Sequence, residues 1–217
     1  IMLSTILRLV ISVLLLCVSL PVAMTAAQDD GDDAPVITVD NVANLEQSLM
    51  IGRGAVNDLA FSPDGSVLAV ATSVGIWLYA EGDITAEPRF LQGHTQLVTS
   101  LVFSSDGAIL YSGGVAGVLM VWDVARGERL AVIDDFATAV LTIALSPDNS
   151  LLAVAGGNER EDFRLYDTES LTLLRESRND EGGWLRTLTF SVDGTQIFIS
   201  DNDGNISAWD VATGERT

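Results

Sequence analysis

The chain has 217 residues, 48% of them hydrophobic, and a formal net charge of −19 at pH 7. This length is enough for one domain with a sizeable core. Eleven basic residues against 30 acidic ones argue against nucleic-acid binding, which needs Lys and Arg at the phosphates, and against adsorption to an anionic membrane. The single cysteine excludes a disulfide within the chain.

Residues 1–27 have the pattern of a secretory signal peptide. Arg8 gives a positive start, residues 9–20 form an apolar run, and residues 23–27 offer small side chains for cleavage. The alternative is an uncleaved membrane anchor, because the apolar run is borderline in length. Cys17 lies inside this segment, so the mature chain would have no thiol. We therefore predict an extracytoplasmic protein that is secreted, periplasmic or at the cell surface, with no membrane contact beyond a possible uncleaved anchor.

An acidic spacer is predicted over residues 28–44. Four of the residues in 29–33 are aspartates, and their repulsion favours an extended segment. A metal site is the alternative, but carboxylates without a fold to position them are usually only solvated. The sequence predicts no metal and no cofactor.

A short motif that ends in Ser-x-Asp-Gly, or a close variant of it, then occurs four times. Its first residue recurs after 42, 42 and 45 residues (61 to 103, 145 and 190). A fixed period of this size indicates one supersecondary unit used repeatedly. We predict a repeat region over 45–217, with repeats at about 52–92, 93–134, 135–176 and 177–217.

Each repeat is predicted to be a β-meander. A first strand leads into the Ser-x-Asp turn, a second strand ends in a short turn that usually contains glycine, and a third strand ends in an aromatic residue. The predicted strands include 56–61, 67–71, 76–79, 98–103, 119–122, 129–133, 163–166, 197–199 and 206–209. No segment outside the signal has a helical period. The expected fold is all-β, a β-propeller of four-stranded antiparallel blades with about four blades present.

These repeats resemble the WD-repeat (WD40-type) family. The resemblance depends on Gly93-His94, the four turns, and an aromatic-Asp pair at 122–123, 166–167 and 209–210. It implies a ring, usually of seven blades, in which the fourth strand of one motif completes the next blade. Residues 45–51 would then be the outer strand of the first blade. We expect a fragment of an exported, bacterial-type member.

The family resemblance also implies a buried network of His, Ser or Thr, Asp and Trp. The second repeat has His94, Ser112 and Trp122, with Ala116 at the Asp position. The fourth repeat has Asp203 and Trp209, and Asp123 and Asp210 follow the two tryptophans. Because a half-made buried network costs stability, we expect apolar packing to hold the blades together.

Candidate partner-binding residues lie in the loops before each first strand and between the second and third strands. We assign this role to Trp184, Arg186, Arg53, His94, Gln96 and Arg160. Trp and Arg are favoured anchors at interfaces. Trp184 falls outside the register that we assign to Trp77, Trp122 and Trp209, although it could instead cap the core.

Two other chemistries are disfavoured. His94 is the only histidine, so a structural role is favoured over that of a general base, and no triad or zinc set can be built. Residues 201–205 resemble the start of a calcium loop, but Ile206 and Ala212 stand where that loop needs Gly and Glu, which favours a hairpin turn.

The sequence therefore predicts a non-enzymatic, exported scaffold that binds a protein or peptide partner. The first alternative is a sensor or targeting propeller whose catalytic or signalling domain lies in further C-terminal sequence. The second is an enzyme acting in the central channel. The predicted inner strands carry mostly apolar residues besides Asn57, Asp58 and Arg186, which disfavours catalysis.

Overall fold

The structure, a computed structural model, describes residues 53–156, 163–177 and 185–217. The chain divides into two compact units, 1–47 and 48–217, and every described residue belongs to the second. The predicted signal peptide, the acidic spacer, residues 45–51, Arg160 and Trp184 therefore lie outside the described residues.

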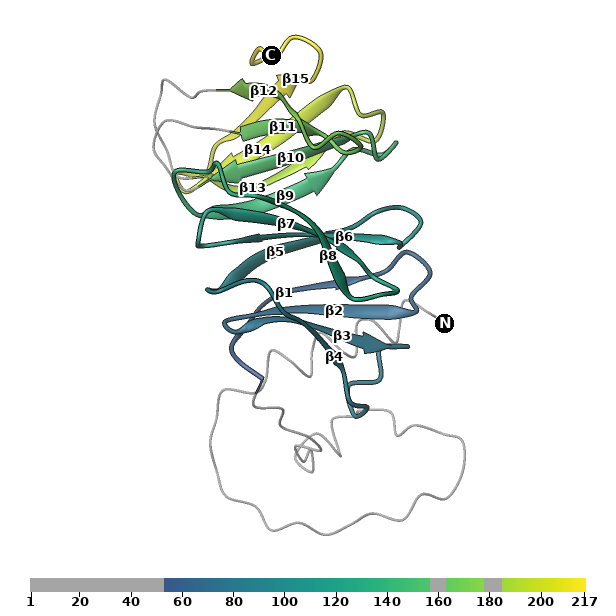
Figure 1. The fold of residues 1–217 in the computed structure, drawn as a ribbon. Helices are drawn as coiled ribbons and strands as arrows, with labels where there is room; N and C mark the ends of the chain where they lie inside the picture. The colour runs from purple at the N-terminus through teal and green to yellow at the C-terminus, as the bar shows by residue number, and fades with distance from the viewer. Residues whose placement is uncertain (1–52, 157–162, 178–184) are drawn as a thin grey trace, which may run out of the picture. The chain divides into compact units, whose positions relative to one another are not determined.

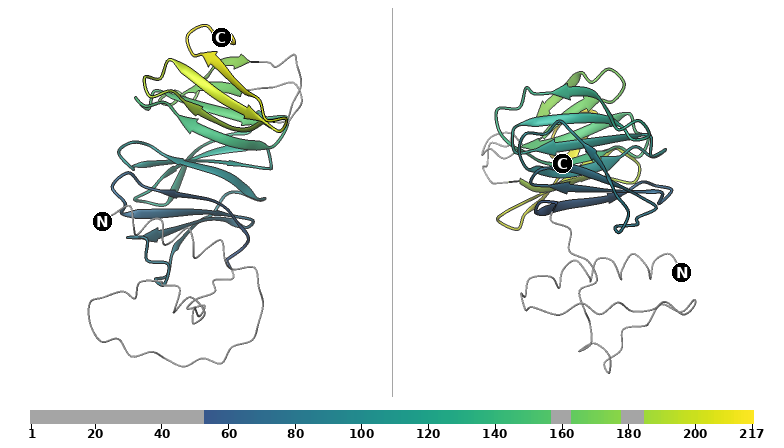
Figure 2. Two further views of the ribbon diagram at one scale, coloured as in Figure 1. Left: turned by 180° about the vertical axis from the view of Figure 1, so that it is seen from behind. Right: turned by 60° about the horizontal axis from the view of Figure 1, so that its bottom comes forward.

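Four antiparallel sheets follow one another along the chain (Figure 1), and the same order is visible from behind in Figure 2. Sheet A comprises β1 (Val56–Phe61), β2 (Val67–Thr72), β3 (Gly75–Ala80) and β4 (Arg89–Leu91). Sheet B comprises β5 (Val98–Phe103), β6 (Ile109–Gly114), β7 (Val118–Asp123) and β8 (Glu128–Ile133). Sheet C comprises β9 (Val140–Leu145), β10 (Leu151–Gly156), β11 (Phe163–Asp167) and β12 (Leu173–Ser177). Sheet D comprises β13 (Leu185–Phe190), β14 (Gln196–Asp201) and β15 (Ile206–Asp210).

The predicted all-β fold of antiparallel sheets is confirmed, with one difference. Sheet D has three strands, and a single bridge between Trp209 and Arg216 stands in place of a fourth. The outer strand of sheet A is β4, and residues 45–51, for which we predicted an outer strand of the first blade, lie outside the described residues. In each sheet, strands adjacent in sequence are adjacent in space, since the shortest connection between antiparallel strands is a tight turn.

The motif recurs because it builds the same turn four times. In the first copy, the Ser62 hydroxyl donates to Asp64 Oδ1 at 2.6 Å and accepts from the Val67 amide at 2.9 Å. Asp64 Oδ1 also accepts from the Ser66 amide at 3.0 Å. The same three bonds recur around Asp106, Asp148 and Asp193. One serine and one aspartate thus satisfy the polar groups of the turn.

The core lies between consecutive sheets. One cluster joins sheets A and B around Leu78 and Trp122, and a second joins sheets B and C around Leu119 and Tyr166. A third joins sheets C and D, where the rings of Phe163 and Trp209 meet edge-on at 5.6 Å. Sheets B and C are therefore buried on both faces, which explains why their strands do not alternate cleanly between apolar and polar residues.

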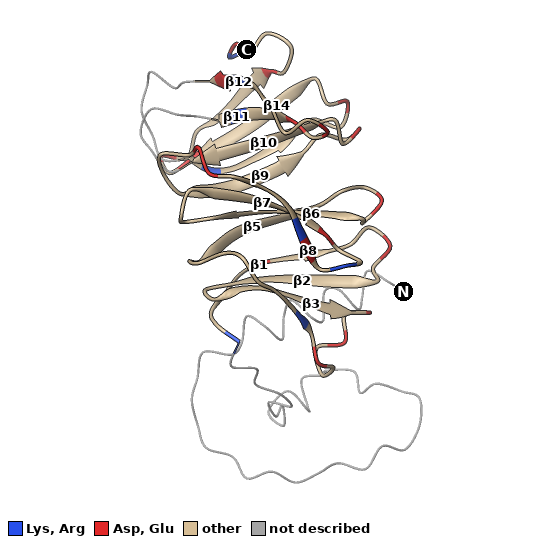
Figure 3. Cartoon of the chain, in the orientation of Figure 1, with Lys and Arg blue, Asp and Glu red and all other residues tan. Residues whose placement is uncertain are grey.

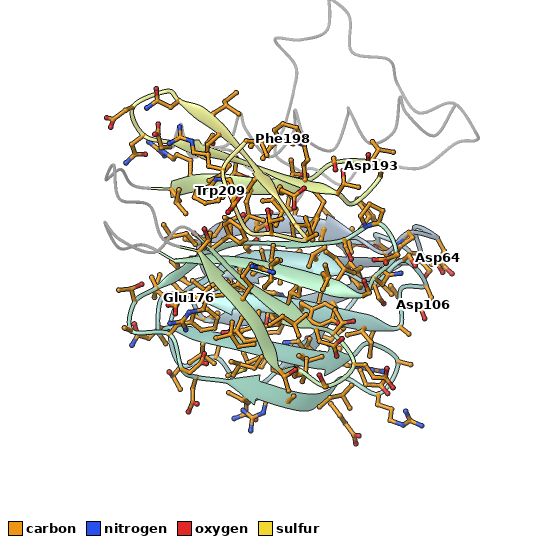
Figure 4. All side chains as sticks on the ribbon, turned by 90° about the horizontal axis from the view of Figure 1, so that it is seen from above. Asp64, Asp106, Glu176, Asp193, Phe198 and Trp209 are labelled. Carbon is orange, nitrogen blue, oxygen red and sulfur yellow. The ribbon has the colours of Figure 1, made fainter. Side chains whose placement is uncertain are left out.

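The strand order separates two rims. We call the edge with the turns between the first and second and between the third and fourth strands the turn rim, and the opposite edge the loop rim. Figure 4 shows Asp64, Asp106 and Asp193 on one side of the sheets and Glu176 on the other. Charged residues concentrate at strand ends and turns, whereas the strands are largely uncharged (Figure 3). Among the described residues, no helix is long and apolar enough to span a membrane.

Candidate partner-binding surface

Hydrogen bonds anchor the loop rim in sheets A and B. In sheet A, the Ser73 amide donates to the Ala55 carbonyl at 2.9 Å, and the Ala55 amide donates to the Ser73 hydroxyl at 3.0 Å. In sheet B, the Val115 amide donates to the Leu97 carbonyl at 3.0 Å. The loop before the first strand is thus tied to the turn between the second and third strands. Variable side chains on a fixed backbone are a common basis for specific binding.

An aromatic and cationic cluster lies where the loop rim meets sheet A. The Arg53 guanidinium lies 4.8 Å from the centre of the Trp77 ring and 3.3 Å from a Glu87 carboxylate oxygen. The Trp77 indole donates to the Arg53 carbonyl at 3.1 Å, and its ring lies 4.5 Å from that of Phe90. Phe90 is 39% exposed and nearby Val74 is 52% exposed. A stacked cation beside exposed apolar surface has the composition of an interface anchor.

The register assigned to Trp77 is wrong. On β2 and β3, Tyr79 faces Leu68, while on β6 and β7 Trp122 faces Leu110. Tyr79 therefore occupies the position of Trp122, and Trp77 corresponds to Met120. The sequence did indicate that Tyr79 corresponds to Trp122, since the two residues lie 15 and 16 positions after their turn aspartates (64 to 79 and 106 to 122). Sequence reasoning thus missed Trp77 and Phe90 as surface residues.

His94, in the loop before β5, is buried rather than on a free surface. Its Nε2 is 2.7 Å from the Ser112 hydroxyl, which also accepts from the Trp122 indole at 2.8 Å. Burial, with a smaller contribution from the positive charge of Arg129, lowers the pKa of His94 to about 4. The ring is therefore neutral at pH 7 and serves a buried hydrogen-bond network. Ala116 supplies only a methyl group where the family pattern has a carboxylate.

The remaining candidates are distributed along the rim. Gln96 and Arg186 are exposed, in the loop before β5 and at the start of β13 respectively. Among the described residues, no hydrogen bond or ion pair joins Arg53, Gln96 and Arg186 to one another. The structure therefore presents separate contact points rather than one preformed pocket.

The fourth repeat does not rebuild the network of the second. Asp203 is exposed, and its amide donates to Asp201 Oδ1 at 2.9 Å. The Trp209 indole donates to the Ser207 hydroxyl at 3.0 Å. Asp201 also accepts from the amide and side chain of Asn205, bonds that hold its pKa below the usual value. Its carboxylate thus serves the hairpin turn, and among the described residues no group of three His, Cys, Asp or Glu side chains could hold a metal.

The aspartate of each aromatic-Asp pair caps the turn that follows it. Asp123 Oδ1 accepts from the Arg126 amide at 2.8 Å, and Asp210 Oδ1 accepts from the Thr213 amide at 2.7 Å. Asp167 accepts likewise from the Ser170 amide at 2.7 Å. These carboxylates belong to the turn rim and hold its backbone.

Asp58, the acidic residue of the first inner strand, links two sheets. Its Oδ2 accepts from the Leu101 amide of sheet B at 2.8 Å, and its Oδ1 accepts from the Leu59 amide at 2.9 Å. Burial raises the pKa of Asp58, and these two bonds oppose that rise. In sheet B, Ser100 occupies the same position and accepts from the Ile143 amide of sheet C at 3.3 Å. The inner strands thus use their polar residues to connect neighbouring sheets.

Comparison with known proteins gives one family and several relatives. The profile of the family described as "WD40: WD domain, G-beta repeat" matches residues 45–74 and 86–123. The small ribosomal subunit protein RACK1y of Oryza sativa subsp. japonica is 25% identical over 171 residues, which cover 73% of this chain and 48% of the relative. The target of rapamycin complex subunit wat1 of Schizosaccharomyces pombe is 27% identical over 155 residues, covering 71% and 48%. The COMPASS component SWD3 of Saccharomyces cerevisiae is 26% identical over 169 residues, covering 73% and 52%.

These relatives correct one prediction. The chain spans about half of their length. Their names place them in the small ribosomal subunit, a target of rapamycin complex and COMPASS, which are intracellular assemblies. The predicted extracytoplasmic location is therefore wrong, and the relatives give no support to an exported or bacterial-type member. The start of the chain suggested export because its basic residue, apolar run and small residues match the pattern of a signal peptide.

Proposed function

We propose that this chain, for which the fold and the comparisons support the WD40 repeat family, is a non-enzymatic scaffold that binds a protein or peptide partner through its loop rim. One observation carries the proposal: among the described residues, the hydrogen-bonded motif that recurs in all four sheets lies on the turn rim. The four Ser-x-Asp turns make the same bonds, whereas the loops before β5 and β9 share no such motif. Residues that differ between repeats are not needed for the repeated fold and remain available for recognition.

The hydrogen bonds of Asp58 and His94 support a non-enzymatic role. Asp58 is engaged by two backbone amides, and His94 is buried against Ser112. Acid–base catalysis requires a group that can reach a reacting atom, and neither side chain has that freedom. Exposed polar and cationic residues on a rigid rim fit surface contact better.

The names of the relatives support a protein partner. All three are named as components of larger assemblies, one of them ribosomal. A partner that is a protein or peptide also agrees with the charge of −19, which disfavours direct binding to nucleic acid. Arg53, Gln96 and Arg186 are the described residues that we assign to the contact, with Trp77 and Phe90 beside them. Trp184 and Arg160 remain candidates outside the described residues.

Affinity capture with paired variants tests this function. We expect Gln96→Ala and Arg186→Ala, alone and together, to reduce recovery of the partner several-fold from a lysate of the source organism. The matched control is Arg126→Ala, which removes a cation that is 72% exposed on the turn rim. Thermal unfolding of each variant would show that the fold is intact. Equal recovery with all variants, or turnover of a small-molecule substrate without a protein partner, would contradict the proposal.

A further inference from the structure

Two of the three junctions between sheets share a clamp. At the junction of sheets A and B, Arg89 at the start of β4 donates to the Ala125 carbonyl at 2.7 Å. At the junction of sheets C and D, Arg175 on β12 donates to the carbonyls of Ala212, at 2.6 Å, and Thr213. In both cases, an arginine of the outer strand binds the last turn of the following sheet.

Each clamp has a glycine opposite it. A Cβ added at Gly127 would lie 2.6 Å from Arg89 Cδ, and one added at Gly214 would also meet Arg175 Cδ. Both glycines have positive φ, 68° and 73°. The arginine stem therefore occupies the space that a side chain at the glycine position would need.

The Ser-x-Asp turns repeat this pairing. A Cβ on Gly107 would lie 3.5 Å from Pro63 of the preceding sheet, and one on Gly194 would lie 3.4 Å from Pro147. Proline thus faces glycine across the A–B and C–D junctions. The added Cβ would make an ordinary van der Waals contact with the proline, so at these two turns it is the positive φ, 72° and 71°, that favours glycine.

The B–C junction has neither the Arg–Gly pair nor the Pro–Gly pair. Ala131 replaces the arginine, as its pairing with Val121 on β7 and β8 shows, and Leu171 replaces the glycine at a φ of 55°. Both side chains pack against the core between sheets B and C. In the turns, Ser105 replaces proline and Asn149 replaces glycine, at a φ of 62°. The Ser105 amide donates to Asn149 Oδ1 at 2.9 Å, and the Asn149 amide group donates to the Ser105 hydroxyl.

We infer that the chain is a tandem of two two-sheet units, A–B and C–D, and that matched residue pairs across each junction select which sheet packs on which. Arg with Gly and Pro with Gly mark a junction within a unit, whereas Ala with Leu and Ser with Asn mark the junction between units. The sequence supports a duplicated unit, because residues 122–129 and 209–216 differ only at Arg126 and Thr213. Leu-Ala-Val-Ala likewise occurs at 68–71 and 152–155, in the first sheet of each unit.

A pair of double-mutant cycles in the full chain tests the pairing. In the first cycle, Ala131→Arg should lower the melting temperature because Leu171 occupies the space of the clamp. Adding Leu171→Gly should restore most of that loss, since the double variant recreates the Arg–Gly pair.

The second cycle removes a clamp and keeps the inference testable if Ala131→Arg fails to fold. Gly127→Ala should lower the melting temperature more than Gly204→Ala, whose added Cβ meets nothing within 4 Å at a φ of 86°. In the Arg89→Ala background, the cost of Gly127→Ala should shrink to that of Gly204→Ala. Recovery in the first cycle or relief in the second supports the tandem. Additive effects in both cycles would overturn it.

Discussion

At the scale of single residues, His94 was one of the predicted partner-binding residues, but its side chain is buried. A histidine with a pKa of about 4 binds no proton in the folded chain at pH 5, whereas the unfolded chain, with a pKa of 6.5, does. The unfolded state therefore gains protons first as the pH falls. Stability should decline between pH 6.5 and pH 4, by roughly 2 to 3 kcal/mol.

Replacing His94 by Gln should remove this pH dependence. We expect His94→Gln to cost about 1 to 2 kcal/mol at pH 7 because the bond to Ser112 is weakened, and to flatten the stability profile between pH 6.5 and pH 4. Urea unfolding at a series of pH values measures both effects. Gln96→Ala, on the same loop but exposed, should leave the slope unchanged. An unaltered slope in His94→Gln would show that another group titrates in this range.

Three of the four turn aspartates accept one hydroxyl hydrogen bond that the fourth lacks. Asp64, Asp148 and Asp193 each accept from a serine or threonine hydroxyl two residues later, and their pKa values are lowered to about 2. Asp106 has Ala108 at that position, and its pKa is lowered chiefly by the bonds from the Ser104 hydroxyl and the Ala108 amide. A carboxyl with a lowered pKa stabilises the fold above its unfolded value of 3.8, and this contribution is lost as the pH falls towards 2.

Ala108→Ser should supply the missing donor. We expect the pKa of Asp106 to fall further, towards that of Asp64, and the acid-unfolding midpoint to move to lower pH. Carboxyl titration by NMR measures the first effect. Ala86→Ser, an exposed substitution beside β4, is the control and should leave Asp106 unchanged. If Asp106 titrates as before in Ala108→Ser, the hydroxyl is not the cause of the difference.

At the scale of strands, the three four-stranded sheets fill one cross-strand position between their third and fourth strands with different residue pairs. Trp77 faces Phe90 in sheet A, Met120 faces Val132 in sheet B, and Arg164 faces Glu176 in sheet C. The last pair is ionic, with 3.2 Å between Arg164 Nη2 and Glu176 Oε1, and the Arg164 side chain is only 12% exposed. The two side chains of each pair are of the same kind, aromatic, aliphatic or ionic, so the same backbone accommodates all three types of pair.

Glu176→Val alone should destabilise the chain by about 1 to 3 kcal/mol, because it leaves the buried Arg164 with less compensation. Arg164→Met with Glu176→Val recreates the pair of sheet B and should recover most of that loss. Chemical denaturation of the two single variants and the double variant gives the coupling. Strict additivity would mean that the two side chains act independently.

The strands were predictable where turns mark their ends. The repeated Ser-x-Asp turns and the aromatic residues bracket the first three strands of each sheet, so these appear where the sequence placed them. The fourth strands are harder to predict, since β4 has only three residues and β12 lacks a motif. Trp77 was misassigned because two aromatic residues on β3 share one face, and only the spacing from the turn aspartate, 15 residues to Tyr79 and 16 to Trp122, indicates which of them occupies the repeated position. His94 was offered both as a binder and as a network residue, and only packing separates these roles.

At the scale of the whole molecule, the charge of −19 acts against folding. Self-repulsion is screened by salt, and the Debye length falls from about 30 Å at about 10 mM to about 8 Å at about 150 mM. We expect the melting temperature to rise over this range, as differential scanning calorimetry would show. A fall would mean that the few ion pairs, such as Arg126 with Asp123, outweigh the repulsion.

The polar residues of the inner strands have a consequence for aggregation. The first strand of a sheet has a free edge, where amides invite an intruding strand. Here, the Leu101 amide on β5, next to the bulge between Val98 and Ser100, is already held by the Asp58 carboxylate of the neighbouring sheet, and Ser100 holds the amide of Ile143 on β9 in turn. A foreign strand would have to displace these side chains before it could add to the edge of β5 or β9, so each of these edges is protected by a side chain from the sheet next to it.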